Sequence, residues 1–217
     1  MIKSKIEWCD YSVNPIKGLC PVACSYCYAR RMYRRFCWNE TIRYDTDWDI
    51  ELYKIKKPAK IFIGSTMELF GKWVKNEWMF DILHKIPHLR QHTFIFLSKQ
   101  PYNLSKWEFF DNCWVGISTT GNDSMSGLED NLKNVRAKVK FVSIEPLLDY
   151  TPMDFRWVDW VIVGRQTPIS VKTKPNPRWV ENIVIRADKE GVPVFIKNNM
   201  ASLLDLPISN LRQEFPK

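Results

Sequence analysis

Long apolar runs are missing from this chain of 217 residues, and their absence limits the class of protein. No stretch approaches the roughly 18 consecutive apolar residues that a membrane-spanning helix needs. Residues 1–7 also lack the apolar core and the small-residue cleavage site of a secretory signal. We therefore expect a soluble, cytoplasmic protein without a membrane partner.

Internal repeats, low-complexity tracts and Gly/Ser linkers are missing as well. The length suits a single domain, because barrels commonly run to about 250 residues as one unit. We therefore expect one domain over residues 1–217. Nothing in the sequence specifies an oligomeric state.

Histidine is scarce: the chain has three, and none of them adjoins a cysteine. Half of the six cysteines, in contrast, lie within eight residues, at positions 20, 24 and 27. In a reducing cytoplasm we expect no disulfide framework, and cysteines this close are usually metal ligands or catalytic groups. We expect the other three, Cys9, Cys37 and Cys113, to be ordinary buried or half-buried thiols.

The charge is basic and unevenly distributed. The chain carries a net charge of +8, and residues 1–43 hold eight Lys and Arg against three Asp and Glu, so five of the eight charges lie there. A polyanionic partner such as nucleic acid fits this balance. The alternative is a basic surface that only aids solubility.

Short β-rich apolar runs alternate with helical or polar stretches, which is typical of a parallel sheet with crossover helices. Several runs are continuously apolar, as strands buried on both faces are. The predicted strands lie at 6–13, 60–64, 93–97, 113–117, 139–142, 160–163 and 192–196. Amphipathic spacing predicts helices at 78–86, 127–135 and 179–190, and the last should stop at Gly191.

Each predicted strand is followed by polar or charged side chains. In a parallel α/β barrel the carboxyl ends of the strands meet on one face, where active sites are built. The candidates for catalysis or substrate contact are Glu145, Lys99, Arg165 and Lys197. Two alternatives remain open: strands simply end where polarity begins, and each of these residues could be half of an interior ion pair.

The three clustered cysteines lie in a segment that reads as a loop around a metal site. A [4Fe-4S] cluster takes one thiolate per iron, so Cys20, Cys24 and Cys27 would leave one iron open for cofactor or substrate. Structural zinc would need a fourth ligand, which no nearby histidine supplies. Zinc and unligated cysteines remain the alternatives.

The cysteine segment and several other parts of the sequence resemble a known superfamily. The pattern Cys20-x3-Cys24-x2-Cys27, with Tyr26 before the last cysteine, resembles the signature of the radical S-adenosylmethionine superfamily. Five further blocks are similar to an uncharacterised phage and bacterial family within it: Ile6-Glu7-Trp8, Asn14-Pro15, Cys27-Tyr28-Ala29, Ser143-Ile144-Glu145-Pro146-Leu147-Leu148 and Asp159-Trp160-Val161-Ile162-Val163-Gly164. These blocks span most of the chain.

The resemblance implies a partial (β/α)6 TIM-type barrel with parallel strands, followed by a short extension over about residues 198–217. It also implies where S-adenosylmethionine would bind. Ser65 and Glu68 occupy the place of the methionine-binding segment, although the usual glycine-rich form is absent. Ser118 and Thr119 match the place where a polar side chain meets the ribose, and Tyr26 matches the residue beside the adenine.

The cofactors implied by the resemblance are a [4Fe-4S] cluster and S-adenosylmethionine. The reduced cluster would cleave S-adenosylmethionine to methionine and a 5′-deoxyadenosyl radical, which abstracts a hydrogen from the substrate. The protein's part would be orientation and the exclusion of water. The implied partner is a one-electron donor of the flavodoxin or ferredoxin type.

Four arginines follow the cysteines at helical spacing: Arg30, Arg31, Arg34 and Arg35. Aromatic residues interleave with them, and arginines beside aromatic rings are one way to hold single-stranded nucleic acid. The alternative is a solvated face of an amphipathic helix. We therefore favour nucleic acid or a nucleotide as the substrate, to be modified or repaired. A nucleic-acid-binding protein stapled by metal without catalysis, and a radical enzyme for a peptide or small metabolite, remain open.

Overall fold

The computed structural model describes residues 2–121 and 125–217. The chain divides into two compact units. The first comprises Met1–Trp114 with Val135–Lys138, and the second comprises Val115–Asn134 with Val139–Lys217. No helix in the described residues is long and apolar enough to cross a membrane.

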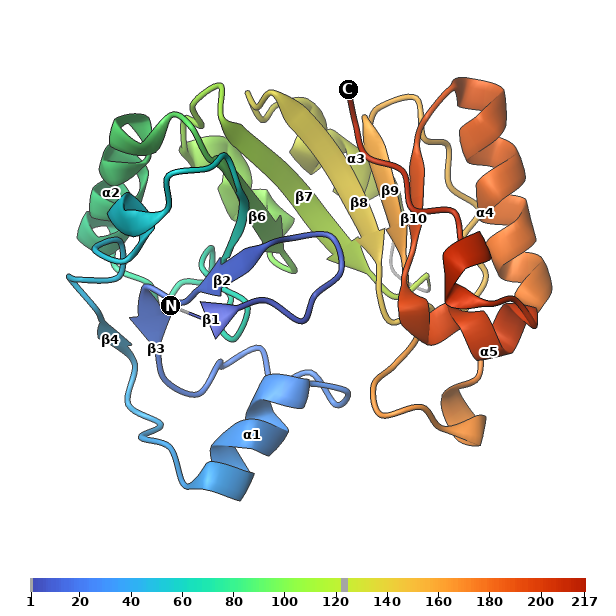
Figure 1. Cartoon of the computed structure of the whole chain (residues 1–217), viewed down its shortest axis with the longest axis horizontal. Helices are drawn as coiled ribbons and strands as arrows, with labels where there is room; N and C mark the ends of the chain where they lie inside the picture. The colour runs from blue at the N-terminus through green and yellow to red at the C-terminus, as the bar shows by residue number, and fades with distance from the viewer. Residues whose placement is uncertain (1, 122–124) are drawn as a thin grey trace. The chain divides into compact units, whose positions relative to one another are not determined.

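The first unit is built on strands in the order β1-β2-β5-β6 (Figure 1). The outer pair is antiparallel, whereas β2, β5 and β6 run parallel to one another. The strands are β1 (Ile2–Lys3), β2 (Tyr11–Val13), β5 (Lys60–Ile63) and β6 (Thr93–Ser98). An antiparallel pair, β3 (Ile16–Lys17) and β4 (Arg43–Tyr44), stands apart from this sheet.

Two helices accompany these strands: α1 (Tyr28–Phe36) and α2 (Asn76–Lys85). Short 3-10 turns complete the unit at η1 (Leu52–Lys54), η2 (Ile86–Leu89) and η3 (Pro101–Lys106). Met79, Ile82 and Leu83 of α2 are buried at the three- and four-residue spacing of an amphipathic helix. The core strands β5 and β6 are apolar on both faces, as a covered parallel sheet requires.

The second unit contains most of β7 (Cys113–Thr119), together with β8 (Val139–Ile144), β9 (Trp160–Val163) and β10 (Val194–Ile196). These strands are ordered β7-β8-β9-β10, and β9 pairs in parallel with both β8 and β10. Every residue of β9 is buried. The helical segments are α3 (Met125–Lys133), η4 (Val171–Thr173), α4 (Pro177–Glu190), η5 (Asn198–Met200), α5 (Ala201–Leu204) and η6 (Ile208–Asn210).

The ends of α4 follow from its sequence. Asn176 caps the amino end by accepting from the backbone N–H of Arg178, and Pro177 occupies the first turn, where its missing N–H is not needed. Gly191 ends the helix in the left-handed conformation at a φ of 70°. The predicted stop at Gly191 is confirmed.

The C-terminal segment returns to β10. The backbone of Phe195 forms an antiparallel bridge with Gln213, and the Trp160 indole N–H donates to the Glu214 carbonyl at 2.8 Å. The ring of Phe215 packs against those of Trp160 and Phe195. Residues 211–215 therefore add to the core of the second unit. The division into one barrel domain and an extension stays a prediction.

Candidate functional site

The three clustered cysteines lie on the segment that joins β3 to α1. Cys20, Cys24 and Cys27 are free thiols, and all three are partly exposed. Ala23 has a left-handed φ of 55°, which turns the chain between the first two cysteines. The backbone N–H of Cys27 donates to the Cys24 carbonyl at 3.1 Å, so the last two cysteines share one tight turn.

Cys27 is also the amino-terminal cap of α1. Its Sγ accepts a hydrogen bond from the backbone N–H of Arg30 at 3.5 Å. The sulfur therefore satisfies one of the N–H groups that have no partner within the helix. The Arg30 guanidinium donates to the Cys20 carbonyl at 2.7 Å. One residue of α1 therefore holds both ends of the cysteine segment.

Gly18 fixes the entry to this segment. Its φ is 121°, and a Cβ there would lie 2.7 Å from the backbone of Ile42. Its N–H donates to the hydroxyl of the buried Tyr33 on α1 at 2.8 Å. Only glycine permits both this conformation and this approach, so the start of the cysteine segment packs directly against α1 and the chain leading to β4.

The donor set fits an iron-sulfur cluster by its chemistry. Three thiols on one loop, with no acidic residue in the first turn of the following helix, suit an anionic group that takes one thiolate per iron. Among residues 2–121 and 125–217, no group of three His, Cys, Asp or Glu is spaced to hold a single metal ion. Thiolates that bind different irons of a cubane need not meet at one point.

Burial raises the pKa of the Cys20 thiol above its ordinary value, and the hydrogen bond from the Glu68 backbone opposes this effect only in part. Glu68 belongs to the segment after β5, to which the resemblance assigns the methionine-binding residues. Iron would reverse the protonation preference, because a bound metal deprotonates its thiol ligands.

The carboxyl ends of β2 and β5 are joined through Asn14, which the sequence patterns did not single out as a site residue. Its side-chain oxygen accepts from the backbone N–H of Thr66 at 2.9 Å, and its amide lies 3.2 Å from the Ser65 hydroxyl. The Tyr28 hydroxyl donates to the Ser65 carbonyl at 2.6 Å. Ser65 is therefore held by both β2 and α1. The place of Asn14 directly after a strand could have identified it.

Glu68 is buried, with 7% of its surface exposed. Its carboxylate accepts from the backbone N–H of Phe70 at 3.0 Å, from the Ser98 hydroxyl at 2.9 Å and from the backbone N–H of Lys99 at 2.6 Å. Burial nevertheless raises the pKa of this carboxyl above its ordinary value. The carboxylate links the ends of β5 and β6, and Lys99 takes part in this network through its backbone.

In the second unit, Glu145 follows β8 and Lys197 follows β10. The Lys197 ammonium and the Glu145 carboxylate form an ion pair with an N–O distance of 2.5 Å. The ion pair that the sequence leaves open as an alternative for these residues is therefore present, while their contact with a substrate stays a prediction.

Ser118 and Thr119 end β7 beside the same glutamate. The Ser118 hydroxyl lies 3.4 Å from the Glu145 carbonyl, and the Glu145 N–H donates to the Thr119 carbonyl at 3.1 Å. The Thr119 hydroxyl accepts from the backbone N–H of Gly121. These two residues therefore join the ends of β7 and β8, while their predicted contact with a ribose stays a prediction.

Arg165, after β9, is 4% exposed. Asn199 accepts from its backbone N–H at 3.2 Å and donates to its carbonyl at 2.8 Å. The guanidinium lies 3.5 Å from the Ser202 hydroxyl through Nη1, whereas its buried Nε has no partner in the described residues. Asn199 and Ser202 are two further residues that no sequence pattern singled out.

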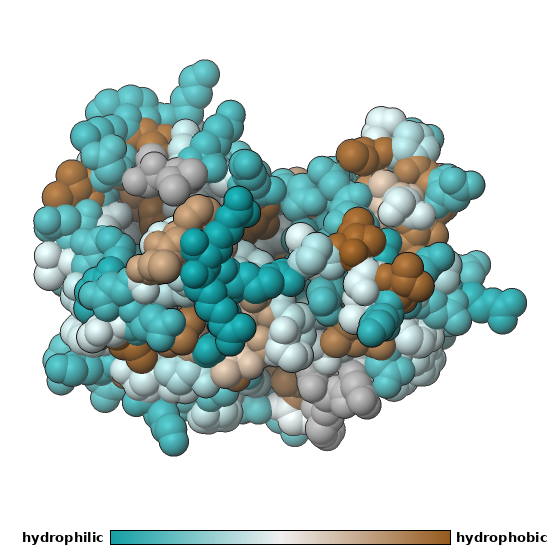
Figure 2. Space-filling model, turned by 90° about the horizontal axis from the view of Figure 1, so that it is seen from below, coloured by the Kyte–Doolittle hydropathy of each residue, from teal (hydrophilic) through white to brown (hydrophobic). Residues whose placement is uncertain are grey.

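The predicted basic stripe is part of α1. Arg31, Arg34 and Arg35 are exposed, whereas Arg30 is partly buried against the cysteine segment. Phe36 and Trp38 are 52% and 41% exposed, and their rings stack with centroids 5.6 Å apart. Helix α1 lies at the bottom of Figure 1, and Figure 2 views the molecule from below. Hydrophilic side chains gather on the face that Figure 2 shows.

The remaining cysteines are distributed unevenly. Cys9 and Cys113 are buried, as predicted, but Cys37 is exposed. The prediction was wrong for Cys37 because α1 ends there, in a left-handed conformation that directs the chain away from the core. Nothing in its local sequence distinguishes it from a half-buried thiol.

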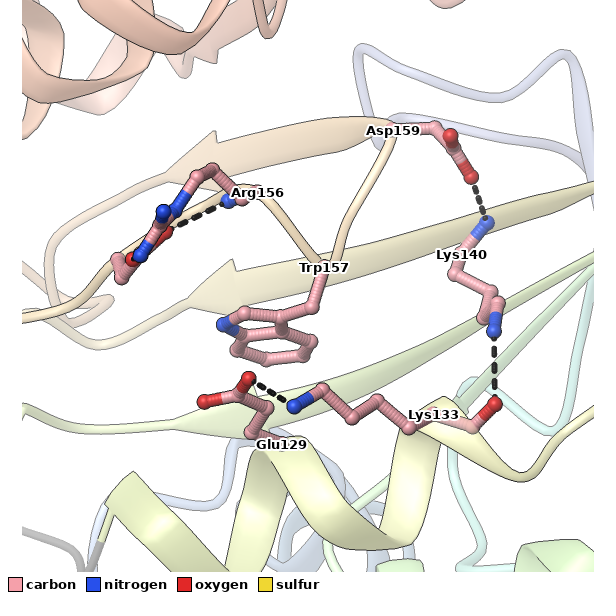
Figure 3. Close-up of a pocket in the computed structure, with 7 residues that line it drawn as sticks. Glu129, Lys133, Lys140, Arg156, Trp157 and Asp159 are labelled. Atoms are coloured by element: carbon pink, nitrogen blue, oxygen red, sulfur yellow. Dashed lines mark hydrogen bonds and ion pairs between the residues drawn. The ribbon is translucent and has the colours of Figure 1, made fainter.

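A hollow of about 540 Å³ lies elsewhere in the second unit (Figure 3). Its walls come from α3 and from the amino ends of β8 and β9, and consist of Glu129, Lys133, Lys140, Asp154, Arg156, Trp157 and Asp159. Lys133 pairs with Glu129 and Arg156 with Asp154, so the charges satisfy one another. No predicted site residue lines this hollow, since those residues follow the carboxyl ends of strands.

The fold is similar to one solved structure, a double mutant of spore photoproduct lyase with bound AdoMet and dinucleoside spore photoproduct. The TM-score is 0.55 at 12% sequence identity, and the match covers 83% of this chain. The chain spans 62% of the length of that protein. The likeness confirms the predicted fold class, which is α/β with parallel strands in a partial TIM-type barrel.

No curated protein matches the sequence. A family model does match it, over residues 3–202, which is most of the chain. The predicted membership in an uncharacterised family agrees with this match. The chain belongs to the family described as protein of unknown function, DUF5131.

Proposed function

We propose that this protein is a radical S-adenosylmethionine enzyme that acts on a nucleic acid or a nucleotide. The observation that carries the proposal is the segment with Cys20, Cys24 and Cys27, which opens α1 in a fold similar to that of spore photoproduct lyase. The thiols are free, they lie on one loop, and a helix amino terminus faces the last of them.

A bound [4Fe-4S] cluster with S-adenosylmethionine would supply the radical chemistry. The protein's own residues would then bind the iron, hold the cysteine segment in place and bind S-adenosylmethionine. The cysteines hold the iron, and Arg30 keeps their segment in place through the Cys20 carbonyl. We assign Tyr26, Ser65 and Glu68 from the first unit, and Ser118 and Thr119 from the second, to S-adenosylmethionine.

The carboxylate of Glu68 is held in a fixed orientation, which suits binding of S-adenosylmethionine. Among the described residues, three donors fix its carboxylate, which has about four lone-pair positions, so they leave one position for an ammonium group. Because the donors are mostly backbone N–H groups, the orientation of this position does not depend on flexible side chains. A preorganised acceptor of this kind suits the amino group of a methionine moiety.

The substrate class rests on α1. Its sequence holds four arginines and no acidic residue, and the exposed rings of Phe36 and Trp38 continue the same surface. Bases stack on exposed aromatic rings, and arginines neutralise the phosphates beside them. The similar spore photoproduct lyase structure holds a dinucleoside, which supports the same class. Glu145, Lys99 and Arg165 are our candidates for contact with the reacting part of the substrate.

The decisive experiment is anaerobic reconstitution with iron and sulfide, followed by chemical reduction in the presence of S-adenosylmethionine. We expect about four irons per chain, as a cubane requires, and release of 5′-deoxyadenosine. A reduced flavodoxin or ferredoxin should replace the chemical reductant. Cys24→Ala should abolish both results, whereas the matched control Cys37→Ala should retain them. Stoichiometric zinc without iron after reconstitution would overturn the proposal.

The surface of α1 also favours a second candidate, a nucleic-acid-binding protein in which metal only staples the cysteine segment. It predicts binding of single-stranded nucleic acid that is sensitive to salt and indifferent to S-adenosylmethionine. Release of 5′-deoxyadenosine separates the two candidates. If release occurs without stimulation by any nucleic acid, a peptide or a small metabolite becomes the substrate to test.

A further inference from the structure

Arg165 is a buried cation that pairs with no carboxylate in the part of the chain that the structure describes. The residue follows β9 and Gly164, and only 4% of its surface is exposed. Its guanidinium has five N–H donors in a planar fork. In the described part of the chain, the Ser202 hydroxyl is the one acceptor within hydrogen-bond distance of that fork, at 3.5 Å from Nη1, and the buried Nε has none.

The neighbouring charges do not supply the missing anion. Glu145, which follows β8, pairs with Lys197 after β10. No carboxylate in residues 2–121 and 125–217 forms an ion pair with Arg165. A buried charge without a counter-charge is strongly unfavourable, so proteins seldom retain one unless a ligand completes it.

The backbone of Arg165 is fixed, so this arginine is not a mobile surface residue. Asn199 bridges its N–H and its carbonyl with two hydrogen bonds of 3.2 and 2.8 Å. Ser202 and Asn199 both belong to the segment after β10. The segment after β10 therefore fixes the backbone from which the Arg165 side chain starts, and Ser202 of the same segment contacts the guanidinium, which gives part of the preorganisation that an anion site needs.

We propose that Arg165, with the Ser202 hydroxyl beside it, forms an oxyanion subsite that takes a phosphate group of the substrate. The fork of an arginine matches two oxygens of a phosphate in a bidentate contact. This inference rests on the proposed function for its substrate class, since the net charge of +8 and the basic α1 favour a phosphate-bearing molecule. The subsite itself lies wholly within the second unit.

The test uses the full chain, without cluster or S-adenosylmethionine, and inorganic phosphate as the probe. Phosphate should raise the thermal midpoint of the wild-type protein in a concentration-dependent manner, because it binds only the folded state. Arg165→Met should remove this rise and weaken phosphate binding at least tenfold by calorimetry. Arg165→Lys should restore part of it. Arg156→Met is the matched control, because it removes an exposed arginine of the same unit.

Two readouts separate this role from a structural one. In the absence of phosphate, Arg165→Met should leave the thermal midpoint unchanged or raised, because it removes an uncompensated buried charge. A midpoint lowered by several degrees, together with a phosphate response like that of the wild type, would overturn the subsite.

A second experiment distinguishes a phosphate of the substrate from the carboxylate of S-adenosylmethionine as the group that binds Arg165. Calorimetry with S-adenosylmethionine on the reconstituted protein should give the same affinity for the wild type and for Arg165→Met. If Arg165→Met loses affinity for S-adenosylmethionine but still binds phosphate like the wild type, Arg165 binds the carboxylate of the cofactor and the proposal is wrong. Phosphate binding needs no iron, so its failure leaves the 5′-deoxyadenosine test intact, and the reverse also holds.

Discussion

Lys197 and Glu145 are joined by an ion pair with an N–O distance of 2.5 Å, although they follow strands β10 and β8, which flank β9. Gly164, directly after β9, lies under this pair. A Cβ at position 164 would lie 2.9 Å from the Lys197 Cδ and 3.1 Å from the Glu145 Cδ. Because Gly164 has no side chain, Glu145 after β8 and Lys197 after β10 have room to meet across the end of β9.

We expect Gly164→Ala to push the ion pair apart. The added methyl should lower the free energy of unfolding by about 1–3 kcal/mol, as overpacking of a filled site does. Urea unfolding measures the change. Gly127→Ala is the matched control, because nothing lies within 4 Å of its Cβ and alanine suits helix α3. Equal stability of Gly164→Ala and the wild type would show that the pair has space to spare.

The contribution of the pair itself can be measured with Lys197→Met and Glu145→Gln. Each side chain is largely buried, with 13% and 25% of its surface exposed, so each single change leaves a polar group in want of a partner. We expect the double variant to lose less stability than the sum of the two single variants, with a coupling of about 0.5–3 kcal/mol. Strict additivity in urea unfolding would mean that the pair contributes nothing to stability.

Glu68→Gln tests the network between β5 and β6. Glutamine has one acceptor oxygen, so its amide group would face a backbone N–H of Phe70 or Lys99, donor against donor. We expect a loss of about 1–3 kcal/mol in the free energy of unfolding. Glu108→Gln, on an exposed side chain of the same unit, should change it by less than about 0.5 kcal/mol.

If Glu68→Gln unfolds like the wild type in urea, its carboxylate does not hold the two strand ends together. Its role in S-adenosylmethionine binding would then have to be tested by cofactor affinity alone.

The exposed arginines of α1 should bind nucleic acid through phosphates. We expect the triple change Arg31→Ser, Arg34→Ser and Arg35→Ser to weaken binding of a single-stranded oligonucleotide. The slope of log K against log salt should fall by about 0.7 for each phosphate that the protein no longer neutralises. Arg30 is left in place, because it holds the cysteine segment.

The control for that experiment removes the same charge elsewhere, through serine at the exposed Lys56, Lys57 and Lys72. Filter binding or fluorescence anisotropy at several salt concentrations distinguishes the two triple variants. An equal loss of affinity in both would show that net charge, and not the surface of α1, drives binding.

The cysteines outside the predicted cluster site should differ in reactivity. Burial raises the pKa of the Cys113 thiol to about 12, and its side chain is fully buried, so almost no thiolate is present at a pH of about 8. Cys37 is exposed at the end of α1. We expect iodoacetamide to label Cys37 and to leave Cys113 unmodified until the protein is denatured. Mass spectrometry of digests decides this, and rapid native labelling of Cys113 would contradict the burial.

Local sequence patterns were enough to predict most of the strands, the cysteine site and the end of α4. Continuous apolar runs place β5 to β10, because a strand buried on both faces reads the same wherever its neighbours come from. The short spacing of Cys20, Cys24 and Cys27 needs no tertiary contact to indicate a metal site, since one loop carries all three. Gly191 ends α4 for an equally local reason, its left-handed φ.

The tertiary structure decided which charges are satisfied. Glu145 meets Lys197 across 52 positions of sequence, and Glu68 meets Ser98 across 30, so no pattern in a short window reveals either contact. Within residues 2–121 and 125–217, the same packing gives Arg165 no counter-charge, while a glutamate and a lysine nearby neutralise each other. Sequence placed polar residues at the strand ends. Which of them hold the fold and which await a ligand depends on distances that only the folded chain sets.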